Sequence, residues 1–196
     1  SVPFVKLLTK LFNACLALSY FPTSWKLAKI VAIPKSNPAS SKPSDYRPIS
    51  LLPTIGKVFE RLILSRLCTF EEDNNIFIKQ QFGFKSKHST TQQVLRISEK
   101  AALGFNRNKS LGLELLDLRK AYDAVWHHAL IHKLSKCNYP LYLIKLIASF
   151  LQDRSAYVSM NKSKSFIFKI LAGVPQGSVI APDLFNLFIN DIPLPD

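Results

Sequence analysis

The sequence predicts an α+β fold in which helices predominate. Long stretches place apolar residues three or four positions apart, as helices do, while shorter stretches alternate apolar and polar residues, as strands do. The chain has 196 residues, of which 47% are hydrophobic, so it can bury a substantial core as one unit of one or two subdomains. The sequence shows no internal repeat and no low-complexity tract, which argues against a solenoid or a disordered chain.

The first half of the chain predicts three helices and a strand. The opening stretch has helical spacing, and residues 28–34 alternate well enough for a strand. A connection rich in proline and serine, residues 36–48, leads to a helix over residues 54–73. Ser89 or Thr90 can cap a further helix. The side of that helix expected to be buried consists of Val94, Leu95, Ile97 and Ala101.

The second half predicts one more strand, a hairpin and further helices. Residues 110–118 are expected to form a buried strand, followed by a helix over residues 123–136 with Asp123 at or near its N-cap. Residues 141–151 predict another helix. Residues 154–174 alternate on both sides of "NKSKS", which is typical of a β-hairpin, and "GSVIAPDLFNLFINDI" returns to helical spacing.

The charge balance favours a polyanion as partner. Lysine and arginine number 26 against 13 acidic residues, which gives a formal net charge of +13 and a pI near 9.8. Basic side chains neutralise phosphates and release counterions, so nucleic acid is the leading candidate; the alternative is a cationic surface with no special partner. The three cysteines are scattered at positions 15, 68 and 137, which predicts neither a disulfide framework nor a zinc site and fits a reducing compartment.

Two apolar stretches raise the question of a membrane segment. The opening stretch is interrupted by Lys6 and Lys10, so an amphipathic core helix that ends before Pro22 is the better interpretation. Residues 142–151 are too short to span a bilayer. We therefore expect no membrane partner. The chain does not begin with methionine, which indicates a piece of something longer.

Asp117 stands at the end of the expected strand, where a turn and a helix follow. A carboxylate at the rim of rigid structure can bind a divalent cation. Aspartates in this position also cap helices or satisfy turns, and the local pattern alone leaves both interpretations open.

Four segments of the chain resemble successive motifs of non-LTR retrotransposon reverse transcriptases, and the jockey-like branch most closely. The segments are "DYRPISLLPTIGKVFERLILSRL" (45–67), "QQFGFKSKHSTTQQVLRI" (80–97), "LLDLRKAYDAVWH" (115–127) and "AGVPQGSVIAPDLFNLFINDIP" (172–193). They occur in the order and approximate spacing of the family, and "FPTSWKLAKIVAIPK" (21–35) is similar to the segment that precedes them. The resemblance thus covers nearly the whole chain.

The resemblance implies the fingers and the first part of the palm of a polymerase. Residues 1–105 would form helical fingers, and residues 106–196 the part of the palm that precedes a second catalytic Asp pair. The palm would contain a small antiparallel sheet made of residues 110–118 and a hairpin over residues 155–172, with helices on one face.

The resemblance assigns the metal chemistry to Asp117. As the first catalytic carboxylate it would hold both Mg²⁺ ions of a two-metal nucleotidyl transfer, and the backbone carbonyl of Leu118 would be the second contact to the ion on the triphosphate side. Tyr122 would close the sugar pocket and exclude a 2′-hydroxyl; the family more often has Phe there, so the stringency of this exclusion is open. Asp123 would cap a helix rather than bind metal.

Further residues are assigned by resemblance to nucleotide and template contacts. Arg47 would grip the incoming triphosphate with its guanidinium, and Lys35 would be a second phosphate contact, a role for which Lys42 competes. Gln176 would pack near the incoming nucleotide and the template base. Gly177 would begin the helix that supports the primer–template.

Two departures from the family bear on activity. Asp183 stands where the family usually has small or apolar residues; it can sit in the first helical turn, where negative charge is favourable, or lie near template phosphates, where it would be repulsive. The family also carries a pair of adjacent aspartates beyond "NDIP", and no such pair occurs up to Asp196. A single carboxylate does not make a two-metal site, so this fragment alone is expected to be inactive.

The predicted function is that of an RNA-directed DNA polymerase, or reverse transcriptase, from a non-LTR element. Its partners would be an RNA template, a DNA primer and deoxynucleoside triphosphates, with two Mg²⁺ ions as cofactors. We expect it in the nucleus and cytoplasm. The alternative is a non-catalytic remnant of such an element that binds nucleic acid through its basic surface.

Overall fold

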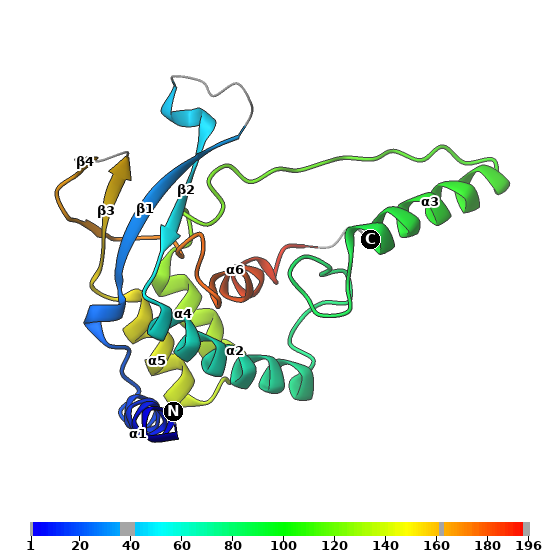
Figure 1. Cartoon of the computed structure of the whole chain (residues 1–196). Coiled ribbons are helices and arrows are strands. Elements are labelled where there is room, and N and C mark those ends of the chain that lie inside the picture. The colour runs from blue at the N-terminus through cyan, green and yellow to red at the C-terminus, as the bar shows by residue number, and fades with distance from the viewer. Residues whose placement is uncertain (1, 36–41, 161–162, 194–196) are drawn as a thin grey trace.

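The computed structural model describes residues 2–35, 42–160 and 163–193. Within them lie six α-helices, two short 3₁₀ helices and five strands, which confirms the predicted α+β class (Figure 1). The helices are α1 (Val2–Ala17), α2 (Thr54–Asn74), α3 (Thr90–Asn106), α4 (His127–Lys136), α5 (Leu141–Leu151) and α6 (Ala181–Ile189), with 3₁₀ turns at Thr23–Trp25 and Pro43–Asp45. The strands are β1 (Leu27–Pro34), β2 (Tyr46–Leu51), β3 (Arg154–Met160), β4 (Ser163–Lys164) and β5 (Phe168–Ile170).

The strands form one mixed sheet centred on β1 and β3. β1 pairs antiparallel with β2 and parallel with β3, where Leu27 lies opposite Ser155, and β3 pairs antiparallel with β4 and β5. The prediction of an antiparallel sheet is therefore wrong for the central pair. The chain passes through α2, α3, α4 and α5 between β1 and β3, and such a long crossover allows a parallel return. The predicted fingers region contributes β1 and β2 to this sheet, and the predicted palm region contributes β3, β4 and β5. The division between these regions near residue 105 stays a prediction.

Helices α2, α4, α5 and α6 gather beside the sheet and share one hydrophobic core (Figure 1). α2 buries Phe59, Ile63 and Leu67 completely, at the spacing of one helix face. The other large core side chains include Leu130, Leu134, Leu143, Leu146, Ile147 and Leu184. Burying each such side chain contributes about 1.5–3 kcal/mol, so α2 and α6 are held in one rigid unit.

α1 is the amphipathic core helix that the sequence predicted, and it ends before Pro22. It buries Phe12 and Cys15, and the Phe12 ring stacks on Phe59 of α2 with 5.1 Å between centroids. Among the described residues, no helix combines the length and the hydropathy that crossing a membrane requires.

Residues 109–118, called here the extended segment, run from α3 back to the body of the molecule without forming a strand (Figure 1). Leu115 and Leu116 are 83% and 85% exposed. The prediction of a buried strand over residues 110–118, and of a sheet made with it, is wrong for the described part of the chain. An apolar run becomes a strand only beside a neighbour that accepts its backbone hydrogen bonds, and no described strand pairs with this segment.

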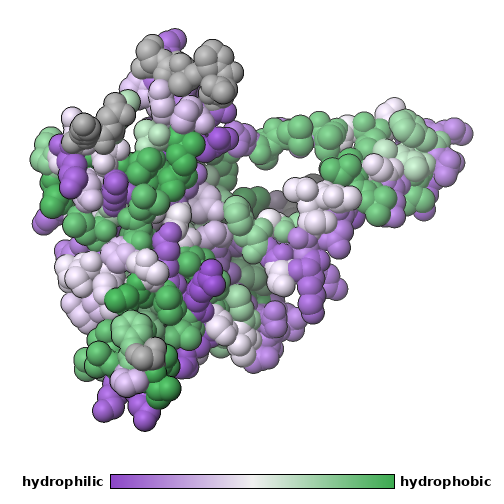
Figure 2. Space-filling model, viewed as in Figure 1, coloured by the Kyte–Doolittle hydropathy of each residue, from purple (hydrophilic) through white to green (hydrophobic). Residues whose placement is uncertain are grey.

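α3 begins where the sequence predicted but does not bury the predicted side. The Ser89 hydroxyl accepts a hydrogen bond from the Gln92 N–H (3.3 Å), and the Gln92 side chain accepts one from the Ser89 N–H (2.8 Å). This capping box fixes the helix start by local contacts. No residue of α3 is buried, and Val94 and Leu95 are mostly exposed. Figure 2 shows the resulting apolar surface along the arm that α3 and the extended segment form.

The helix predicted over residues 123–136 begins at His127, with Trp126 as its N-cap. Asp123 lies in the preceding turn, where its N–H donates to the Lys120 carbonyl (2.9 Å), so the cap prediction is wrong. The predicted hairpin is confirmed in its strands β3, β4 and β5. Its residues 161–162, like residues 36–41 of the proline-rich connection, fall outside the described residues.

Candidate nucleotide and metal site

Residues 173–180, called here the 173–180 loop, join β5 to α6 and are held from several sides. The Gly173 N–H donates to the Val125 carbonyl and the Val174 N–H to the Tyr122 carbonyl, both at 2.8 Å. The Gly173 carbonyl in turn accepts from Arg154 Nη1 and lies 2.8 Å from His127 Nε2. A carbonyl can only accept, so His127 carries its proton on Nε2. These bonds tie the start of the loop to the turn that contains Tyr122.

The middle of the loop lies against β2. The Ser50 N–H donates to the Gln176 carbonyl at 2.7 Å. Gly177 has φ +121°, and a Cβ there would lie 2.6 Å from the Ser50 carbonyl oxygen. Only glycine fits both the backbone angle and the close approach. The structure therefore places Gln176 and Gly177 beside the strand that carries Arg47.

The end of the loop rests on a buried carboxylate of α2. Glu60 Oε2 accepts hydrogen bonds from the Ser178 hydroxyl (2.5 Å), the Val179 N–H (2.6 Å) and the Ile180 N–H (3.4 Å). Burial raises the pKa of Glu60, and these three bonds oppose that shift. The residues that lead into α6 are thus held by a carboxylate that belongs to another helix, α2.

Three residues of this arrangement were missed by sequence reasoning: Glu60, Arg154 and His127. A signal for Glu60 was present, because it shares the helix face of Ile63 and Leu67, where a carboxylate must find partners. Arg154 is 3% exposed, and burial lowers its pKa to about 10, while the charge of Glu60 acts in the opposite direction. Nothing in the local sequence distinguishes Arg154 or His127 from surface residues.

Tyr122 is half-buried at the edge of α6. Its ring stacks on Phe185 with 5.1 Å between centroids and an interplanar angle of 18°, and Phe84 approaches it edge-on at 6.4 Å. Burial raises the pKa of its hydroxyl. The ring is thus fixed by packing and its carbonyl by Val174, while its role in a sugar pocket stays a prediction.

The two predicted phosphate contacts lie on the β1–β2 hairpin. Arg47 is exposed on β2 opposite Ile33. Lys35 follows β1 and is exposed, and its ammonium donates to the Ser44 carbonyl at 2.8 Å. Both cations are therefore accessible to a phosphate, although Lys35 is already engaged by the neighbouring turn.

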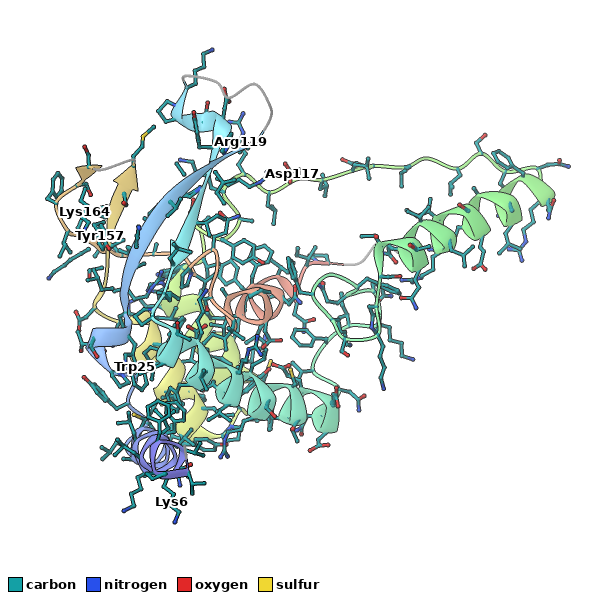
Figure 3. All side chains as sticks on the ribbon, viewed as in Figure 1. Lys6, Trp25, Asp117, Arg119, Tyr157 and Lys164 are labelled. Atoms are coloured by element: carbon teal, nitrogen blue, oxygen red, sulfur yellow. The ribbon has the colours of Figure 1, made fainter. Side chains whose placement is uncertain are left out.

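Asp117 and Leu118 lie on the extended segment, and both are exposed; Figure 3 shows Asp117 there, on the stretch that leads away from α3. A carboxylate and a backbone carbonyl are the hard oxygen donors that Mg²⁺ prefers, so the donors fit in kind. Their number is too small for a metal site. In the described part of the chain, the one cluster of three candidate ligands is Cys68, Glu71 and Asp183, and it does not include Asp117.

Asp183 lies in the first turn of α6, as one of the two interpretations predicted, and faces Glu71 of α2. Burial, followed by the charge of Glu71, raises the pKa of Asp183 to about 8. Burial also raises the pKa of Glu71, although the Tyr139 hydroxyl donates a hydrogen bond to it at 2.8 Å. The two acids therefore hold one proton between them more readily than isolated carboxyls would.

Comparison with known proteins agrees with the motifs. The family described as "Reverse transcriptase (RNA-dependent DNA polymerase)" matches residues 33–195. The chain is 41% identical over 190 residues to the RNA-directed DNA polymerase from mobile element jockey of Drosophila melanogaster, covering 96% of this chain and 20% of that protein. It is 40% identical over 189 residues to the probable RNA-directed DNA polymerase from transposon X-element of the same species, covering 96% of this chain and 21% of that protein.

A third relative, the probable RNA-directed DNA polymerase from transposon BS of Drosophila melanogaster, is 38% identical over 189 residues, covering 96% of this chain and 21% of that protein. The chain spans about a fifth of the length of these relatives. The similarity confirms the resemblance to the jockey-like branch. The chain therefore belongs to the reverse transcriptase family, whose members generally use divalent metal ions, a nucleic-acid template and nucleotide substrates.

Proposed function

We propose that this chain supplies the fingers and the first half of the palm of an RNA-directed DNA polymerase of a non-LTR retrotransposon. Such a polymerase adds deoxynucleotides to a DNA primer on an RNA template. The observation that carries the proposal is the 173–180 loop, which joins β2 to the turn at Tyr122 through backbone hydrogen bonds. Residues from three motifs that are far apart in the sequence thus meet at this loop.

In this proposal the loop and β2 form the nucleotide side of the site. Arg47 and Lys35 bind the triphosphate, since both cations are exposed on one hairpin. Gln176 packs against the incoming nucleotide, and Gly177 supports the primer–template. Tyr122 forms the wall against a ribose 2′-hydroxyl, a task to which its fixed ring is suited.

Asp117 and the Leu118 carbonyl form the metal side. When bound, the two Mg²⁺ ions would activate the primer 3′-oxygen and stabilise the pyrophosphate leaving group. One carboxylate cannot complete a two-metal site, so the proposal requires a further carboxylate pair from outside the described residues. We propose the nucleus and cytoplasm as its location, in keeping with the free cysteines.

Primer extension tests the proposal. The 190 residues aligned with the jockey polymerase would replace the equivalent segment of that polymerase. We expect the chimaera to extend a DNA primer on an RNA template in Mg²⁺. A chimaera that binds primer–template but extends nothing would favour the non-catalytic remnant.

The chain alone gives a second measurement. With a net charge of +13, it should bind primer–template duplex with little sequence preference and with an affinity that falls steeply as salt rises, because several phosphates are neutralised. Binding that ignores salt, or no binding at low salt, would contradict both the polymerase and the remnant.

A further inference from the structure

Glu60 occupies an unusual position for a carboxylate, because it is 1% exposed in the core face of α2. A buried charge is costly unless it is hydrogen-bonded. All three bonds to Glu60 come from residues 178–180, where the 173–180 loop becomes α6. The carboxylate therefore accepts hydrogen bonds from a single segment, which begins directly after Gln176 and Gly177.

Arg154 holds the other end of the same loop. Its guanidinium is buried and donates to the Gly173 carbonyl at 2.8 Å. Glu60 and Arg154 are both buried and carry opposite charges, and the charge of Glu60 favours the ionised form of Arg154. The loop is thus anchored at Gly173 by the cation and at residues 178–180 by the anion.

The stretch between the two anchors is the part that meets β2. The Gln176 carbonyl accepts from the Ser50 N–H, and Gly177 leaves no room for a side chain beside the Ser50 carbonyl. If residues 178–180 shifted, the contact with Ser50 would shift with them. The contact between Gln176 and β2 thus lies directly beside the residues that bond to Glu60.

We propose that Glu60 is a positioning residue of the nucleotide site, which holds the 173–180 loop so that Gln176 and Gly177 stay in register with β2. Glu60 itself touches no substrate. The inference rests on the proposed function, and it predicts that losing Glu60 weakens the use of deoxynucleotide more than the binding of primer–template.

The first test uses the 196-residue chain without any assay of synthesis. Glu60→Gln keeps an acceptor oxygen but loses the charge, and Ser178→Ala removes one donor as a milder variant. Glu71→Gln is the matched control, because Glu71 is a buried carboxylate of the same helix whose partners are Tyr139 and Asp183 rather than residues 178–180. We expect amide hydrogen exchange at Val179 and Ile180 to quicken about tenfold or more in Glu60→Gln, less in Ser178→Ala and not in Glu71→Gln. Unchanged exchange at these amides in Glu60→Gln would overturn the inference.

The second test measures kinetics in the jockey chimaera. Glu60→Gln should raise the KM for deoxynucleotide about tenfold, while the Kd for primer–template stays within about twofold of wild type. Glu71→Gln should change neither. A fall in active enzyme with an unchanged KM would show a merely structural role and overturn the inference. Failure of the wild-type chimaera to extend a primer would count against the proposed function alone, because the exchange measurement decides the role of Glu60 independently.

Discussion

The 173–180 loop and the extended segment both carry predicted site residues, but the structure supports them in opposite ways. The loop is bonded to β2, α2, β3 and the turn at Tyr122, and its two glycines have no space for a side chain. The extended segment is exposed throughout, and around Gly112 no atom lies within 4 Å of a would-be Cβ. The proposed nucleotide side is thus held by hydrogen bonds among the described residues, whereas the segment that carries the proposed metal side is exposed.

The difference shows that apolar sequence alone does not make a strand. The extended segment contains five leucines, Leu111, Leu113, Leu115, Leu116 and Leu118, and all of them are exposed. Covering each exposed leucine would contribute about 1.5–3 kcal/mol, so the segment has much to gain from a partner that the described residues lack. Among the described residues, no strand pairs with the segment that carries Asp117.

Asp117→Asn in the jockey chimaera should have the largest effect. In the chimaera, the jockey polymerase supplies the remaining residues of the proposed metal site, so the role of Asp117 can be measured there. Removing a charge that bridges two divalent ions costs several kcal/mol, so we expect the rate of incorporation to fall at least about 10³-fold. Glu114→Gln, on the same segment, should leave the rate nearly unchanged. Incorporation within tenfold of wild type in Asp117→Asn would remove Asp117 from catalysis.

Gly177→Ala tests the loop directly. The new Cβ would meet the Ser50 carbonyl at 2.6 Å in a backbone conformation that alanine rarely adopts, so the free energy of unfolding should fall by roughly 2–4 kcal/mol. Gly112→Ala is the matched change in the extended segment and should be neutral or stabilising by up to about 1 kcal/mol. Urea unfolding of the 196-residue chain measures both, and equal losses would erase the contrast between the two regions.

Tyr122→Ala probes the turn that follows the extended segment and bonds to the 173–180 loop. Its removal opens the space beside Phe185 and takes away the proposed wall against a 2′-hydroxyl. The ratio of kcat/KM for a ribonucleotide to that for its deoxy counterpart should rise roughly 10- to 100-fold in the chimaera, with primer–template affinity unchanged. Tyr142→Ala, on α5, is the control. An unchanged ratio would leave Tyr122 as a packing aromatic of α6.

Asp183→Asn, in the first turn of the helix that follows the 173–180 loop, should give the smallest effect, which is a change in how stability depends on pH. The folded-state pKa of Asp183 is raised from 3.8 to about 8, so its contribution to stability is present at low pH and lost as pH rises toward 8. The groups that interact with it are Glu71, Tyr139 and Cys68, and Glu72 and Lys85 line the same pocket. The asparagine variant should be more stable than wild type near pH 8, by on the order of 1 kcal/mol, and should show a flatter pH profile.

Thermal unfolding at several pH values between 4 and 8 measures that profile. Glu114→Gln provides the comparison, because its carboxylate is exposed on the extended segment. A wild-type stability that does not decline toward pH 8 would show that Asp183 ionises freely in the folded chain.

Sequence reasoning succeeded where local contacts decide the structure. The capping box at Ser89, the core face of α2 and the glycines of the 173–180 loop each have a signal within a few residues. It failed for residues 110–118, because pairing depends on a distant neighbour. It failed for Asp123 because the turn at Lys120 delays the start of α4 to His127.

In the candidate site, too, contacts between residues far apart in the sequence could not be predicted. The proximity of Gln176 to β2 required the tertiary structure, since Ser50 and Gln176 are far apart in sequence. Glu60 and Arg154 were missed because their partners are backbone groups of a distant loop. The roles of Arg47, Lys35, Asp117 and Leu118 stay predictions from the motifs.

The parallel pairing of β1 with β3 has a consequence for how the chain folds. More than half of the sequence separates Leu27 from Ser155, so β1 and β2 leave the ribosome long before β3 exists to pair with them. Closing so large a loop is slow, and until then the unpaired side of β1 can bind other chains. A chain truncated before Arg154 would keep this edge open permanently, and we expect it to aggregate rather than to fold.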